Sequence, residues 1–210
     1  MRSRRDFVDG LGLIVVSGSF HFVRHGQTLD NVRGVRCGGD RDVALTERGL
    51  AEARAAAIRF RQSGGPCGVI VAGPLTRTQV TAEIFREELK IPVIQQEWLR
   101  ERALGAWNGL SIEETRSWFE AHRLPPGGES EDDFRHRVMS GLSGLADLAD
   151  LWSQTPLLVG SKGVGRILLT VLTGQSFVEL GNCELVTFTA PVEAGGGGDW
   201  LGRWSWRRCH

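Results

Sequence analysis

The sequence predicts a three-layer α/β/α sandwich, in which helices cover both faces of a mixed, mainly parallel sheet. Two observations support this fold class. Short apolar runs that end in turns alternate along the chain with segments of helical periodicity. The chain has 210 residues, of which 41% are hydrophobic and 24% charged, as in an ordinary globular protein. We therefore expect a single domain over residues 1–210.

Five strands are expected where apolar runs of a few residues meet turn-forming residues. They cover residues 19–26, 68–74, 91–96, 156–160 and 184–190. Helical periodicity predicts helices over residues 46–61, 75–89, 111–122, 131–151 and 164–172. Ser130, with Asp133 three residues later, offers an N-cap for the fourth of these helices.

Two further segments interrupt this alternation. Residues 104–130 include the loop LPPGGES and are the best candidate for an insertion that covers a substrate. The run GGGG at 195–198 predicts a flexible joint, and residues 199–210 form a Trp-rich tail. We expect the tryptophans of this tail to pack on the body of the protein rather than to contact a ligand.

Charge and hydropathy exclude several classes of partner. Lys plus Arg (25) balance Asp plus Glu (25), so no overall basic field favours nucleic acid. No stretch approaches the ~20 apolar residues that span a membrane. The pair Arg4-Arg5 resembles a twin-arginine export signal, but the apolar run after it is short and no A-x-A-like site follows. A cytoplasmic protein is expected, and no feature of the sequence indicates an oligomeric state.

The four cysteines form no metal-binding pattern. They are scattered, without a CxxC pair or a Cys/His cluster at zinc spacing, as in a reduced cytosolic chain. No activating base is visible beside Cys37, so we interpret it as a small buried or loop residue rather than a nucleophile.

The strongest chemical signal is VRHGQTLDN, at residues 23–31. It places Arg24 and His25 at the carboxyl end of the first expected strand. A neutral imidazole can attack phosphorus and form a phosphohistidine, which divides one difficult displacement into two easier ones. Neighbouring guanidinium groups would oppose protonation of His25 and would hold phosphoryl oxygens in a bidentate manner.

Five ordered motifs lie at compatible spacing along the chain. They are RHG at 24–26, GDRDVALTERG at 39–49, GPLTRTQVTA at 73–82, LRERALGAWNG at 99–109, and GGES at 127–130 followed by Arg137. Together they resemble the histidine phosphatase superfamily, the phosphoglycerate mutase-like proteins, over roughly residues 20–186. One departure is Ala44, where the family usually has Pro. RHG alone would be a weak signal, whereas the ordered set is a strong one.

The resemblance implies a phosphoglycerate mutase-like fold and a role for several residues. Arg77 takes the place of the second phosphate-binding arginine, and Glu101 that of the general acid that protonates the departing alkoxide. Thr28 and Asn31 follow the RHG motif at the family's spacing and are expected to bind substrate. Arg24 and Arg77 are expected to supply cationic donors from two adjacent strand ends. No metal and no cofactor is implied.

The segment TPLLVGSKGVGRILLTVL, at 155–172, departs from the family pattern. It reads as a buried strand, a turn and a helix, a junction at which α/β proteins often bind anions. The family has S-H-G in this turn, and its histidine completes the phosphate pocket. Here the turn reads Ser161-Lys162-Gly163, so Lys162 stands in the place of the second histidine and Gly163 is expected to line the substrate site.

Three interpretations of Lys162 remain open. It keeps a positive charge at pH 7, but it is flexible and lacks the planar geometry of imidazole. It can bind phosphoryl oxygens and preserve reduced or retuned activity, mark a protein that binds phosphorylated ligands without turnover, or be an engineered replacement. The first is favoured, because the rest of the site is intact.

The expected function is therefore phosphomonoester hydrolysis of a small phosphorylated metabolite through phospho-His25. The alternatives are a pseudophosphatase that binds phosphorylated ligands and a mutase-like phosphotransferase. A mutase would have to retain the phosphoenzyme and reposition its substrate.

Overall fold

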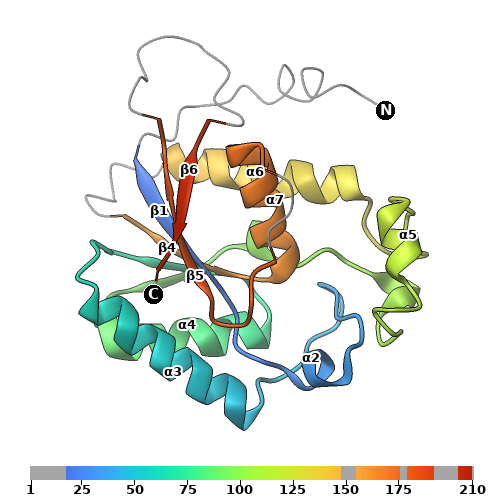
Figure 1. Cartoon of the computed structure of the whole chain (residues 1–210), viewed down its shortest axis with the longest axis horizontal. Coiled ribbons are helices and arrows are strands. Elements are labelled where there is room, and N and C mark those ends of the chain that lie inside the picture. The colour runs from blue at the N-terminus through green and yellow to red at the C-terminus, as the bar shows by residue number, and fades with distance from the viewer. Residues whose placement is uncertain (1–17, 148–154, 176–178, 192–202, 210) are drawn as a thin grey trace.

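A six-stranded sheet forms the centre of the protein, with the strand order β3-β2-β4-β1-β5-β6 (Figure 1). The computed structural model describes residues 18–147, 155–175, 179–191 and 203–209. The strands are β1 (Ser19–Arg24), β2 (Ile70–Ala72), β3 (Val93–Gln95), β4 (Leu157–Gly160), β5 (Leu185–Thr189) and β6 (Ser205–Arg208). β3, β2, β4 and β1 are mutually parallel, whereas β5 runs antiparallel to both β1 and β6. The predicted mixed, mainly parallel sheet is confirmed.

Helices cover both faces of this sheet. They are α2 (Leu29–Arg33), α3 (Glu47–Gln62), α4 (Thr76–Leu89), α5 (Arg116–Glu120), α6 (Glu131–Asp147) and α7 (Lys162–Thr173), with 3-10 turns at Glu97–Leu99 and Gly105–Trp107. α3 and α4 lie on one face, and α6 and α7 on the other (Figure 1). None of the helices in the described residues is long and apolar enough to cross a bilayer.

The core is divided by the sheet because neighbouring side chains of a strand point to opposite faces. In β1, Phe22 packs in the cluster with α6 and α7, while Val23 packs in the cluster with α3 and α4. In β4, Leu158 belongs to the first cluster and Leu157 to the second. All four side chains are fully buried, so β1 and β4 are fixed from both sides.

Two expected helices differ from the structure, and two elements of the structure were not expected. Helix α7 begins at Lys162, two residues before the expected start, because Ser161 is extended (φ −110°, ψ 171°) and takes the N-cap position. The helix expected over 111–122 shortens to α5, since Ser111 forms an isolated bridge with Val35. Helix α2 and strand β6 were not expected at all. The last four residues of the predicted 131–151 helix, the N-terminal twin arginine and the GGGG joint lie outside the described residues.

The segment 104–130 forms a small unit at one end of the molecule, around α5 (Figure 1). Its centre is aromatic, with the ring of Trp107 5.3 Å from that of Trp118 and 5.4 Å from that of Phe119. Arg36 belongs to the chain that follows β1 and α2. Its guanidinium lies 3.8 Å from the centre of the Phe119 ring. This contact joins the unit to that part of the chain.

Part of the C-terminal tail completes the sheet. β6 pairs with β5, and Trp204 just before it is buried with its ring 5.6 Å from that of Phe20. Trp206 is half-buried and donates from Nε1 to Gln175 Oε1 at 2.7 Å. These two tryptophans pack on the body of the protein.

Replacement of Trp204 by Ala is therefore expected to lower the free energy of unfolding by about 3–5 kcal/mol, because a buried ring leaves a cavity. Trp206→Ala is the matched control, because the same kind of side chain is removed two residues further along the chain, at a half-buried position in β6. Urea unfolding, followed by circular dichroism, measures both. An equal, small loss for the two variants would show that the tail is not part of the core.

Candidate active site

His25 lies directly after β1, at the carboxyl ends of the parallel strands. Its backbone N–H donates to Gly160 O at the end of β4 (2.9 Å), and its side chain is 4% exposed. Nδ1 lies 2.8 Å from the carbonyl oxygen of Gly26. Because a carbonyl can only accept, we assign the proton to Nδ1. The neutral ring then carries its lone pair on Nε2, the nitrogen that can act as a nucleophile.

The environment of His25 keeps this imidazole neutral. Its pKa is lowered well below the usual 6.5, first by burial and then by the positive charges of Arg77 and Arg24. The hydrogen bond to Gly26 O acts in the opposite direction but is outweighed. A buried, unprotonated imidazole beside two guanidinium groups has the electronic state that nucleophilic attack requires.

Arg24 supplies a buried donor beside His25. Nη1 donates to Leu180 O at 2.8 Å, and burial lowers the pKa of Arg24, although the carboxylates of Glu101 and Glu179 counteract this. Within the described residues, the buried Nε of Arg24 and the buried Oγ of Ser161 have no hydrogen-bond partner. Arg24 pairs in the sheet with Gly160, the residue before Ser161. Buried polar atoms are nearly always paired in folded proteins, so these two atoms mark a candidate ligand site.

Arg77 reaches the same place from the first turn of α4. It is 1% exposed and donates to Arg41 O (2.9 Å) and Gly38 O (3.1 Å). The expectation that Arg24 and Arg77 come from adjacent strand ends is wrong, because β4 lies between β1 and β2. The strand order therefore places the Ser161–Gly163 turn, which follows β4, between the loops that carry the two arginines.

Glu101 lies across the amino end of α7. Its Oε1 accepts from the backbone N–H of Arg102 (2.7 Å) and its Oε2 from that of Gly163 (2.8 Å). A Cβ at position 163 would lie 2.1 Å from Glu101 Oε1, so glycine gives the carboxylate its room. The charge of Glu101 also acts on Arg24. The proposed acid and the proposed nucleophile thus share one set of neighbours.

Lys162 is the first residue of α7 and lies at the rim. Its Nζ forms an ion pair with the carboxylate of Glu179, and its side chain is 41% exposed. This contact, and more weakly the charge of Arg24, lower the pKa of Glu179. The amino end of a helix carries partial positive charge, which disfavours an ammonium there. The carboxylate of Glu179 offsets this repulsion.

Thr28 and Asn31, both expected to bind substrate, contact each other at the start of α2. Thr28 Oγ1 accepts from Asn31 N (3.3 Å), and Asn31 Oδ1 accepts from Thr28 N (3.1 Å). Asn182 Nδ2 then donates both to Asn31 Oδ1 (3.2 Å) and to His25 O (2.9 Å). These side chains hold the backbone of the His25 loop. Asn182 belongs to none of the sequence motifs, which explains why it was missed.

Two aspartates explain the GDRDVALTERG motif. Asp40 accepts from the backbone N–H groups of Leu104 (2.9 Å) and Gly105 (2.8 Å), and so fastens the 104–130 segment to the site. Asp42 accepts from Thr76 N at 3.0 Å and caps the helix that carries Arg77. Sequence reasoning had given neither residue a role.

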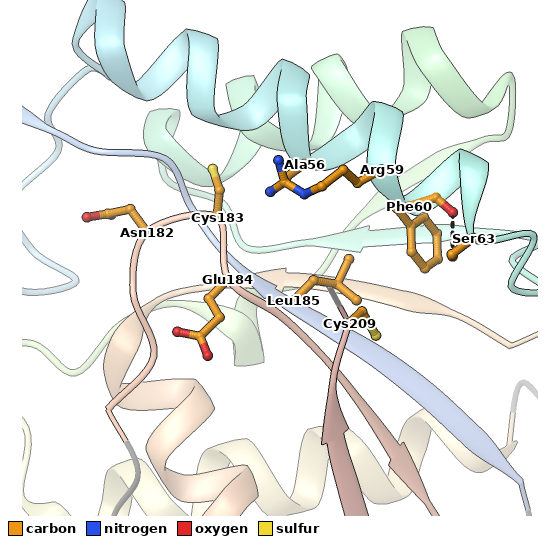
Figure 2. A pocket seen from close by; sticks show the side chains of 9 residues that line it. All are labelled: Ala56, Arg59, Phe60, Ser63, Asn182, Cys183, Glu184, Leu185 and Cys209. Carbon is orange, nitrogen blue, oxygen red and sulfur yellow. Dashed lines mark hydrogen bonds between the residues drawn. The ribbon is translucent and has the colours of Figure 1, made fainter.

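A cavity of ≈390 Å³ lies beside this site, between α3 and β5 (Figure 2). It is lined by Ala56, Arg59, Phe60, Ser63, Asn182, Cys183, Glu184, Leu185 and Cys209. Figure 2 shows the Asn182 side chain directed away from Arg59 and Phe60. The lining of this cavity includes none of His25, Arg24 and Arg77.

Buried thiols do not add a nucleophile. Burial raises the pKa of Cys37 to about 11 and that of Cys183 to about 12, so both remain protonated at neutral pH. Among the described residues, no group of three or more His, Cys, Asp or Glu side chains is arranged to hold a metal ion.

Several known proteins are similar to this chain in sequence and fold. Residues 20–195 match the model of the histidine phosphatase superfamily (branch 1). Two 2,3-bisphosphoglycerate-dependent phosphoglycerate mutases are similar in sequence. The protein of Methylobacterium radiotolerans is 32% identical, and the match covers 79% of this chain and 84% of that protein. The protein of Brucella ovis is 31% identical, with 82% of this chain and 89% of that protein covered. A mycobacterial glucosyl-3-phosphoglycerate phosphatase complexed with VO3 superposes with a TM-score of 0.72 at 25% identity, covering 91% of this chain and 97% of that one.

The protonation state of His25 can be tested directly. At about pH 6, where an ordinary histidine side chain is mostly protonated, we expect neutral His25 with its proton on Nδ1. ¹⁵N NMR of labelled protein, with His25→Ala to assign the signal, reads both the charge and the tautomer. Because the folded pKa lies below the unfolded one, the contribution of His25 to the free energy of unfolding should fall as pH drops below about 6.5. An imidazolium signal at pH 6 would contradict the electrostatic argument.

Proposed function

The chain belongs to the histidine phosphatase superfamily, and from this premise we propose that it is a cytoplasmic enzyme that hydrolyses a small phosphorylated metabolite, a phosphomonoester, through phospho-His25. One observation carries the proposal. A buried imidazole with its lone pair on Nε2 lies beside Arg24 and Arg77, and Arg24 keeps an unpartnered Nε within the described residues. This set matches a phosphoryl group, whose charge is spread over three equatorial oxygens.

The first step transfers the phosphoryl group to the protein. Nε2 of His25 attacks phosphorus, and the bond between phosphorus and the ester oxygen breaks. Arg24 and Arg77 bind the equatorial oxygens, and Ser161 Oγ adds a hydroxyl donor. Protonated Glu101 gives its proton to the departing alkoxide, which leaves as the alcohol.

The second step releases phosphate. A water molecule attacks the phosphorus of phospho-His25 and loses a proton to the Glu101 carboxylate. The bond between Nε2 and phosphorus breaks, and its electron pair returns to the imidazole. Inorganic phosphate departs, and His25 and Glu101 regain their starting protonation states.

A mutase is the second candidate, and the named relatives favour it. The two reactions share the phosphohistidine and differ in the acceptor, which is water in one case and a substrate hydroxyl in the other. A pseudophosphatase would bind the phosphoryl group and transfer it to neither.

One experiment separates the three candidates. The purified protein is incubated with a panel of phosphorylated metabolites that includes phosphoglycerates, while phosphate release, isomer exchange and acid-labile phosphohistidine are measured. We expect release together with labelling, and loss of both in His25→Ala by several orders of magnitude. That variant should still bind vanadate, since both arginines remain. Isomer exchange without release would identify a mutase, and binding without labelling would refute both enzymatic assignments.

The role proposed for Lys162 is to bind the phosphoryl oxygens in place of the family's second histidine. Its ammonium now contacts Glu179 at the rim, and the charge of Arg24 reaches the same carboxylate. A bound phosphoryl group would compete with Glu179 for both cations. Exchange of one anion for another explains how a residue paired on the surface could still contribute to the pocket.

Two substitutions test this role. Lys162→His should keep the fold and raise turnover, because a short imidazole restores the geometry of the family's turn. Lys162→Ala should weaken vanadate affinity by about 10-fold or more, since a charge-assisted hydrogen bond is worth roughly 1.5–3 kcal/mol. Arg86→Ala, which removes a surface ion pair with Glu83 on α4, is the control at matched ionic strength. If both Lys162 variants behave like this control, Lys162 lies outside the site.

A further inference from the structure

Arg137, on α6, binds the segment that carries Glu101. Its Nη1 donates to the carbonyl oxygens of Trp98 (3.0 Å) and Arg100 (2.9 Å), and its Nη2 lies 3.5 Å from the carbonyl oxygen of Glu101 itself. One guanidinium thus contacts three backbone carbonyls within four residues. These contacts fix the chain on the amino side of Glu101.

Glu129, from the GGES motif, binds the other side of the same segment. Its carboxylate receives two hydrogen bonds from Arg137, from Nε at 2.9 Å and from Nη2 at 2.7 Å. Its backbone N–H donates to Ala103 O (2.9 Å), while its Oε2 accepts from Ala103 N (3.4 Å). Arg137 and Glu129 together form what we term the acid clamp, which holds residues 98–103 from both sides.

The acid clamp is separate from the phosphate pocket. None of the contacts described for Arg137 or Glu129 reaches His25, Arg24 or Arg77, which come from β1 and α4. The side chains of Arg137 and Glu129 are only 28% and 18% exposed, so their paired hydrogen bonds are partly shielded from water. A bidentate pair in such surroundings fixes geometry far better than a surface ion pair.

We propose that Arg137 and Glu129 are positioning residues that hold Glu101 where it can protonate the leaving group. The inference rests on the proposed function, because it assumes that Glu101 is the general acid. Proton transfer requires heavy atoms within about 2.6–3.2 Å, and a misplacement of about 1 Å can cost ~100-fold in rate. Through Glu101 the acid clamp acts on protonation of the alkoxide in the first step and on deprotonation of water in the second, and it leaves phosphoryl binding alone. The value of kcat/KM reports the first of these steps.

The test compares two classes of ester. Aryl phosphates have acidic leaving groups that need little protonation, whereas alkyl phosphates need a proton from the acid. For Arg137→Gln we expect kcat/KM to fall by about 100-fold with alkyl phosphates, and by only a few-fold with aryl phosphates, with vanadate inhibition unchanged. Glu129→Gln should show the same selectivity, and Arg137→Lys should restore part of the alkyl activity.

A double variant separates positioning from a general structural role. In a Glu101→Gln background, Arg137→Gln should cause no further loss with alkyl phosphates, because both changes disable the same proton transfer. Arg86→Gln, which breaks the exposed pair with Glu83, should change neither ester class. Circular dichroism and thermal unfolding check that each variant is folded.

The outcomes that overturn the inference differ from those that overturn the proposed function. Equal losses for both ester classes, or additive losses in the double variant, would show that the acid clamp only stabilises the fold. Should Arg137→Gln not fold, the same comparison is read from Glu129→Gln and Arg137→Lys. If the wild-type protein hydrolyses neither ester class, the proposed hydrolysis fails and the positioning role fails with it.

Discussion

The guanidinium groups of Arg24 and Arg77 are buried beside the imidazole of His25. Much of the surrounding structure serves to hydrogen-bond these two cations and to offset their charge. A buried cation must be hydrogen-bonded, and its charge must be offset nearby. Arg77 is bonded by the carbonyl oxygens of Gly38 and Arg41, and Arg24 by that of Leu180. Each of these carbonyls belongs to an irregular segment, so the arginines also fix the shape of the loops. Burial, together with these same positive charges, lowers the pKa of His25 and favours its neutral form.

The negative charges that act on Arg24 are the carboxylates of Glu101 and Glu179. The charge of each carboxylate raises the pKa of Arg24, and neither forms a direct hydrogen bond with Arg24 among the described contacts. The Nε of Arg24 has no hydrogen-bond partner among the described residues, in keeping with the proposed role of Arg24 in binding a phosphoryl group. Asp40 and Asp42 serve a different purpose, since each binds backbone N–H groups and joins one loop to the next.

Sequence reasoning predicted the elements whose cause is local. Alternating buried residues in β1 and β4, and the periodicity of α3 and α4, are properties of short segments and were identified correctly. Family motifs identified His25, Arg24, Arg77 and Glu101, which the structure places in one region. The catalytic roles of these four residues stay predictions, as do the roles of Thr28, Asn31, Gly163 and Lys162 toward substrate.

The remaining features depend on distant partners. The strand order, with β4 between β1 and β2, is decided by packing of the whole sheet. The short α5 follows from the bridge between Ser111 and Val35, and β6 from pairing with β5. Asn182 acquires its place only when the β5 loop folds back on His25. No local pattern of residues encodes any of these contacts.

The hydrogen bond from the Gly163 backbone to Glu101 has a consequence for how this site tolerates change. A main-chain donor is the same whatever side chain stands next to it, so the acid keeps this anchor when the residue at 162 is exchanged. Position 163 is constrained in the opposite sense, because any Cβ there meets the carboxylate. Neighbouring positions in one turn thus differ: an exchange at 162 leaves this backbone anchor in place, whereas a side chain at 163 would have to displace the carboxylate from it.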